Sequence, residues 1–223
     1  FYTYTAARFT VVPLAVFAVY LVIRHRRALR APLLRGVGLA ALAAGVTLLP
    51  LAIYTIGHTA EVLGRPGQVW LWNPAIHHGH PWLTLGQHVL RTLGMVFVRG
   101  DRIWRHNLSL RPVFDVLMGL VFVLGVGVSL WRAIRPPPAG RVWAWAVLLL
   151  WLAFFLVPTI LAEDTPHYLR AIGALPAVCI LAALGLDFLI ERVKFKGRGL
   201  NIAMLVLLFS GYLTAKDYFG DYV

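Results

Sequence analysis

Six long apolar runs constrain what this chain can fold into. A helix needs about 20 apolar residues to cross the hydrocarbon core of a bilayer. Because lipid cannot bond to bare backbone groups, such runs fold as continuous helices. We therefore predict an all-α, polytopic transmembrane helix bundle with about six membrane-spanning helices. The runs cover residues 7–23, 36–56, 112–131, 142–161, 171–190 and 200–215.

The composition agrees with this class. Hydrophobic residues make up 60% of the chain and charged residues only 13%, whereas about a quarter is usual in soluble domains. A formal net charge of +12 would favour nucleic-acid binding in a soluble protein. Here the basic residues gather between the apolar runs. This placement is typical of residues that set the membrane topology and contact lipid headgroups. No nucleic-acid partner is expected.

The basic residues also predict an orientation. Residues 24–35, 132–141 and 191–199 are short connections that together contain more than half of the 21 Lys and Arg residues. By the positive-inside rule these connections are cytoplasmic. Residues 58–111 and 162–170 then lie on the extracytoplasmic side. The expected location is a plasma membrane, crossed several times.

The outer loop 58–111 contains an amphipathic segment near 82–98. Trp82, Leu85, Val89 and Leu93 recur at helical spacing, with polar residues on the opposite side. This pattern predicts an interfacial helix lying on the membrane surface. The alternative is a helix that packs on its own membrane domain and touches no substrate.

Three histidines in the same loop resemble a metal-binding cluster. His77, His78 and His80 are close together in the sequence, but no acidic or Cys residue lies near them. We therefore expect no metal site there. Whether the protein needs a divalent ion elsewhere stays open at this stage.

A polar cluster at 163–170 separates two of the apolar runs. Ionisable groups at a membrane boundary are costly unless they face water, a partner or a ligand. Arg170 lies at the start of a predicted helix, where it could hold an anionic lipid headgroup. Alternatively, Arg170 pairs with Glu163 or Asp164 and only anchors the helix.

Several other chemistries have no counterpart in the sequence. There is no Gly-rich phosphate loop, no nucleophile elbow and no Cys–His nucleophile pair. The lone Cys179 lies inside an apolar run, so it has no partner for an internal disulfide.

Five short strings, in the same order along the chain, resemble a known family. Together they resemble bacterial members of the protein O-mannosyltransferase-like family, glycosyltransferase family 39, of the GT-C superfamily. The closing residues 212–219 resemble that family's exit from its last membrane helix. The strings are residues 1–9, 69–74, 92–101, 105–108 with 111–112, and 166–176.

This resemblance implies a hexosyltransferase in the bacterial inner membrane. It would move a sugar from a polyprenyl-phosphate donor to a protein, lipid or glycan acceptor at the extracytoplasmic face. Family members carry their general-base Asp in the first large outer loop. This sequence is expected to begin after that loop, so the base is expected upstream of Phe1. Residues 1–223 would then be a single transmembrane domain, the C-terminal membrane portion of a longer chain.

The resemblance also suggests roles for individual residues. Departure of the phosphate requires fixed positive charge where negative charge develops. Arg170 and Arg8 are the candidates for gripping this phosphate, with His167 and Tyr168 as hydrogen-bond donors. The residues expected to order the loop or touch sugar hydroxyls are Arg99, Asp101, His106, Asn107, Glu163 and Asp164.

Other interpretations remain open. Gly100-Asp101 is also ordinary turn chemistry, and Asp101 could simply pair with a neighbouring Arg99, Arg102 or Arg105. The whole chain could instead be a transporter or flippase subunit for lipid-linked sugars. A non-catalytic scaffold, in which the outer loop docks a partner, is the third alternative.

Overall fold

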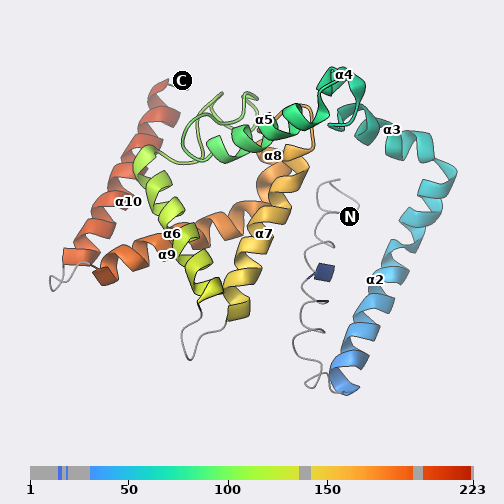
Figure 1. Cartoon of the computed structure of the whole chain (residues 1–223), viewed down its shortest axis with the longest axis horizontal. Helices are drawn as coiled ribbons and strands as arrows, with labels where there is room; N and C mark the ends of the chain where they lie inside the picture. Colours follow the sequence, from blue (N-terminus) through green and yellow to red (C-terminus); the bar gives the residue numbers. More distant parts are fainter. Residues whose placement is uncertain (1–14, 17–18, 20–30, 136–141, 193–197, 222–223) are drawn as a thin grey trace. The chain divides into compact units, whose positions relative to one another are not determined.

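The computed structural model describes residues 15–16, 19, 31–135, 142–192 and 198–221. These residues are mostly helical and contain no β-strand, which confirms the predicted all-α class. They divide into two compact units, residues 1–79 and 80–223. Each unit is described by itself below (Figure 1).

The first unit contains three described helices. These are α2 (Ala31–Gly57), α3 (Thr59–Val69) and α4 (Pro74–His77). The side chain of Asn73 caps α4, because its oxygen accepts a bond from the backbone N–H of Ala75 (3.0 Å). The amide nitrogen of Asn73 donates back to the carbonyl of Gln68 (3.1 Å), which ties the turn to the end of α3.

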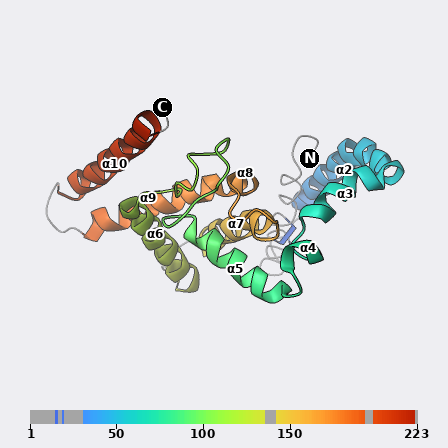
Figure 2. The ribbon, with the colours of Figure 1, turned by 90° about the horizontal axis from the view of Figure 1, so that it is seen from above.

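The second unit holds the remaining elements. The helices are α5 (Pro81–Gly94), α6 (Val116–Ile134), α7 (Val142–Ile160), α8 (Tyr168–Ala171), η3 (Ile172–Ala174), α9 (Leu175–Arg192), α10 (Arg198–Lys216) and the π-helical turn η4 (Asp217–Asp221). The unit is seen from a second direction in Figure 2.

Four described helical segments are long and apolar enough to cross a membrane. They are Gly38–Gly57, Val116–Ile134, Tyr168–Arg192 and Leu200–Gly220. The apolar helix Ala144–Ile160 is shorter, and the predicted run 7–23 lies largely outside the described residues. The count of about six spans is therefore not confirmed, but the apolar helices indicate a membrane protein.

The centre of the second unit is the contact between α6 and α9. A side chain at Gly125 would overlap the carbonyl oxygen of Leu181, and one at Gly185 would overlap the carbonyl oxygen of Val121. The two backbones approach closely because these positions lack a Cβ. Phe122, Leu181 and Ala182 form the buried apolar cluster beside this contact.

Helix α7 packs against the η3 turn, just before α9, through the aromatic pair Trp151 and Phe155. A side chain at Gly173 would overlap the ring of Phe155. The indole N–H of Trp151 donates to the carbonyl oxygen of Gly173 (2.8 Å). Both contacts hold the η3 turn, and with it α8, against α7.

Polar contacts join the start of α6 to the end of α10. Asp115 caps α6 by accepting from the backbone N–H groups of Leu117 (3.0 Å) and Met118 (3.1 Å). The hydroxyl of Ser210 in α10 also donates to Asp115. Arg111 donates to Asp217 (2.8 Å). The start of α6 and the end of α10 therefore lie at the same end of the unit.

Helix α5 buries two of its polar side chains and exposes apolar ones. His88 and Thr92 are buried, whereas Trp82 and Leu90 are more than two-thirds exposed. His88 Nδ1 lies 2.9 Å from the carbonyl oxygen of Ile160, at the end of α7. The predicted helix near 82–98 ends at Gly94 and continues as turns to Val98. Its exposed apolar side is the side that a membrane-surface helix requires.

Candidate functional site

A pocket of about 860 Å³ lies beside the C-terminal end of α5, in the second unit. The end of α5, the loop that follows it and the turn after α7 line this pocket. Besides apolar groups it contains three arginines and three carboxylates, which is an unusual density of charge for so apolar a chain. The charged lining residues are Arg91, Arg99, Arg102, Asp101, Glu163 and Asp164.

The loop between α5 and α6 is closed by its own backbone. Gly100 N–H donates to the carbonyl of Leu110 (3.0 Å), and Leu110 N–H donates to the carbonyl of Asp101 (2.7 Å). A side chain at Gly100 would overlap both the carbonyl oxygen of Arg111 and the hydroxyl of Tyr168. Glycine at this position therefore lets the loop lie directly against the start of α8.

Asp101 is the centre of the hydrogen bonds at the site. Its side chain is buried, and its Oδ1 accepts from Ile103 N–H (2.9 Å). Its Oδ2 accepts from Tyr168 N–H (2.8 Å) and lies 2.8 Å from His106 Nδ1. Burial alone would raise the pKa of Asp101, but these hydrogen bonds outweigh it and lower the pKa below its usual value. The carboxylate is therefore ionised at neutral pH.

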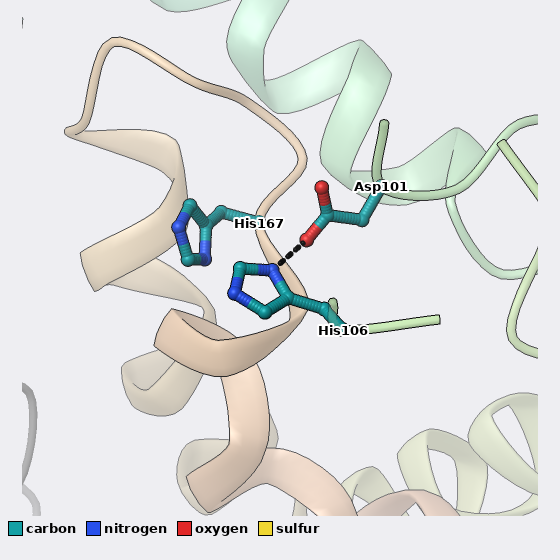
Figure 3. Close-up of side chains that lie close together, drawn as sticks. All are labelled: Asp101, His106 and His167. Atoms are coloured by element: carbon teal, nitrogen blue, oxygen red, sulfur yellow. Dashed lines mark hydrogen bonds and ion pairs between the residues drawn. The ribbon is translucent and has the colours of Figure 1, made fainter. Parts of the chain in front are cut away.

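The tilted rings of His106 and His167 lie against each other beside Asp101 (Figure 3), with their centroids 4.6 Å apart. His106 Nε2 is buried and has no hydrogen-bond partner among the described residues. His167 is also buried, and its backbone N–H donates to the hydroxyl of Thr159 (2.8 Å). Burial and the positive charge of Arg170 lower the pKa of His167, so its ring is neutral at pH 7.

Tyr168 and Asn107 converge on one carbonyl group. The Tyr168 hydroxyl donates to the carbonyl oxygen of Arg111 (2.6 Å), and the Asn107 amide donates to the same oxygen (3.0 Å). The side-chain oxygen of Asn107 accepts from the hydroxyl of Tyr218. Both predicted site residues therefore tie the loop to α8 and to the end of α10.

Arg170 is not neutralised by the acidic residues near it. Among the described residues it forms no ion pair with Glu163 or Asp164, both of which are exposed. Its Nη1 is buried without a hydrogen-bond partner among those residues. The interpretation of Arg170 as half of an anchoring ion pair is thus not supported by the structure.

The structure brings most of the predicted residues together. Asp101, His106 and His167 form one cluster, with Asn107 and Tyr168 bonded around them. Arg99, Glu163 and Asp164 line the adjacent pocket. Arg8 lies outside the described residues. The simple ion pair expected for Asp101 with a neighbouring arginine is replaced by the bond to His106.

Two arginines that line the pocket were not among the predicted site residues. Arg91 was recognised only as part of the polar side of the α5 segment, and Arg102 only as a possible ion-pair partner. The available signal for Arg91 was that it is the one Lys, Arg, Asp or Glu residue in this helix. Nothing in the sequence distinguished Arg102 from its neighbour Arg105, which is exposed and does not line the pocket.

Comparison with known proteins does not assign a role to these residues. No protein-family model, no curated protein and no solved structure matches the chain.

Proposed function

We propose that this chain is part of a membrane glycosyltransferase of the GT-C type. It would move a sugar from a polyprenyl-phosphate donor to a protein, lipid or glycan acceptor at the extracytoplasmic face of a bacterial inner membrane. The observation that carries the proposal is the charged pocket at one end of a set of apolar helices. The resemblance of residues 92–101 and 166–176 to glycosyltransferase family 39 supports it.

The arginines of the pocket suit a phosphate ligand. Arg91, Arg99 and Arg102 belong to α5 and the following loop and line one pocket. A guanidinium binds phosphate oxygens through paired N–H groups. When the sugar–phosphate bond breaks, negative charge develops on the leaving phosphate, and fixed cations stabilise it. Arg170, with a buried Nη1 free of hydrogen bonds within the described residues, is a fourth candidate.

The carboxylates suit the sugar. Glu163 and Asp164 are exposed and line the same pocket, so their oxygens can accept hydrogen bonds from sugar hydroxyls. Asp101 is saturated by bonds within the protein, which favours an orienting role.

The polyprenyl chain of the donor would lie along the apolar surface. Leu90 of α5 lines the pocket and is exposed, and Trp82 of α5 and Leu120 of α6 are exposed as well. A long isoprenoid is soluble only in the membrane. A charged pocket at the ends of apolar helices is therefore where its phosphate would be presented.

A transporter or flippase subunit is the competing function. Transport across the bilayer generally uses polar or charged groups near mid-membrane. The described span windows contain few charged residues, and the charges of the site gather at helix ends. This distribution favours chemistry at the membrane boundary.

The test is sugar transfer in membranes that contain the protein expressed from its complete natural reading frame. The donor is a polyprenyl phosphate bearing a radiolabelled hexose. We expect Arg99→Ala to lower kcat/KM at least tenfold and Arg99→Lys to recover part of it, because charge returns without the paired geometry. Arg170→Ala and Arg170→Lys are measured in the same way.

The matched control is Arg105→Ala, which removes an exposed arginine from the same loop but outside the pocket lining. Its transfer rate should stay within about twofold of the wild-type rate, since surface charges contribute little. Equal rates for all three alanine variants at equal expression contradict the proposed phosphate site. Transbilayer movement of the labelled lipid without any sugar transfer would support a flippase instead.

A further inference from the structure

The side chains of Asp101, His106 and His167 gather possible metal-ligand atoms in one place. A carboxylate oxygen and one imidazole nitrogen from each histidine all lie within 4.8 Å of one another. The residues come from two segments that are far apart in the sequence, the loop after α5 and the turn before α8. Donor atoms gathered around one point are what a single metal ion requires.

His106 is held in the form of a metal-binding histidine. His106 Nδ1 lies 2.8 Å from Asp101 Oδ2, where the ring N–H can donate to the carboxylate. Nε2 is then the ring nitrogen that can bind an ion. Metal-binding histidines commonly donate their other ring N–H to a carboxylate in this way, which fixes the orientation of the ring.

The free nitrogen of His106 is an independent sign of a ligand. The His106 side chain is only 5% exposed, and its Nε2 has no hydrogen-bond partner in the described part of the chain. A buried polar atom without a partner destabilises the fold. An ion bound to Nε2 would remove that destabilisation.

His167 offers the second nitrogen. Its side chain is buried beside His106, with the ring planes inclined by 45°. Its Nδ1 accepts only a long contact of 3.4 Å from the backbone N–H of Arg170. Neither ring nitrogen of His167 is therefore committed to a strong bond within the described residues.

We propose that His106 and His167 bind a divalent transition-metal ion of the zinc class, with Asp101 orienting His106 through its Nδ1. Imidazole nitrogens suit zinc and its neighbours, whereas Mg²⁺ and Ca²⁺ prefer sets of oxygen ligands. Two protein ligands leave coordination positions open for water or a substrate group. Asp101 also lines the charged pocket, so the ion would lie beside it.

This inference goes beyond the proposed function, and it is tested without measuring sugar transfer. The full chain, purified in detergent with a tag that lacks histidine, is stripped with a chelator and titrated with zinc against a competing chromophoric chelator. After gel filtration the metal content is measured by mass spectrometry. We expect one zinc per chain, and a rise in Tm when zinc is added.

The variants are chosen to separate the cluster from other histidines. His106→Ala and His167→Ala should each weaken zinc binding at least tenfold and abolish the rise in Tm. Asp101→Asn, which keeps the shape but removes the charge, should also weaken binding. The matched control is His80→Ala, because His80 is exposed and its side chain makes no cap bond at the start of α5. It should bind zinc like the wild type.

The outcomes that overturn the proposal are equally concrete. A stripped wild-type chain that takes up no zinc refutes the site, whatever the variants do. Uptake that survives His106→Ala and His167→Ala in chains that elute like the wild type places the zinc elsewhere. If an alanine variant aggregates, His106→Gln and His167→Gln replace it, and undiminished binding by these also refutes the site.

Discussion

Helices α2 and α6 have similar compositions, but their glycines differ in what packs against them. Both are long apolar helices that carry Gly several times. In α2, no described atom outside the helix lies within 4 Å of where a side chain at Gly45 would begin. In α6, a side chain added at Gly125 would overlap the backbone of α9. Small residues in an apolar helix thus permit a close contact but do not specify one.

The comparison also holds along α6 itself. Gly125 and Gly127 are two residues apart, so they point to different sides of the helix. Gly125 faces α9, whereas Gly127 has open space where a side chain would begin. The response of each position to an added methyl group therefore separates packing from intrinsic helix propensity.

The largest expected effect is that of Gly125→Ala. The new methyl group would overlap the Leu181 carbonyl oxygen, and backbone cannot move aside as a flexible side chain can. We expect the free energy of unfolding to fall by about 1–3 kcal/mol or more. The measurement is thermal or denaturant unfolding in detergent micelles, followed by circular dichroism.

Gly127→Ala and Gly45→Ala are the matched controls for this change. Both positions have open space, so alanine should leave stability unchanged or raise it by up to about 1 kcal/mol through helix propensity. A loss at Gly127 equal to that at Gly125 would show that the α6–α9 contact does not set the stability of this unit.

A smaller effect is expected for Gly173→Ala. Its methyl group would overlap the ring of Phe155, which is a side chain and can turn away. We expect a loss of about 1–2 kcal/mol. The double variant with Phe155→Leu should lose less than the sum of the two single changes, as a double-mutant cycle would measure.

The control for Gly173 is Gly211→Ala in α10, where a side chain would meet open space. Strictly additive losses for Gly173→Ala and Phe155→Leu would mean that the two positions do not contact each other. In that case the packing of α7 on the η3 turn needs another explanation.

The smallest effect concerns the polar end of α6. Asp115→Ala removes the cap of the helix and the bond from Ser210, and such caps contribute about 1 kcal/mol. Ser210→Ala removes only the bond between helices and should cost less. If Asp115→Ala costs more than Gly125→Ala, polar contacts rather than close packing dominate the stability of this unit.

Much of the helical layout could be predicted from sequence, because hydropathy and length are properties of a segment by itself. The run predicted at 36–56 lies within α2, and the run at 112–131 corresponds to the span Val116–Ile134. The predicted start at residue 112 is too early. Asp115 caps the helix, and Arg111 instead bonds to Asp217.

Helix partners were harder to predict. Ala41 with Gly45, and Gly173 with Ala177, have the spacing of close helix contacts. Gly173 does contact Phe155, but nothing described contacts Gly45. The Gly125–Gly185 approach was not predicted, because in an Ala- and Gly-rich chain many pairs have suitable spacing and only the arrangement of helices selects one.

The sequence by itself determined the class of this protein: an all-helical membrane protein with its polar residues gathered between apolar runs. Hydropathy acts on each segment locally, so this information is readable in order along the chain. Only the tertiary structure decided that Asp101 bonds to His106 and to the backbone of Tyr168. Such bonds depend on how the loop after α5 packs against the start of α8. No local property of either segment determines this contact.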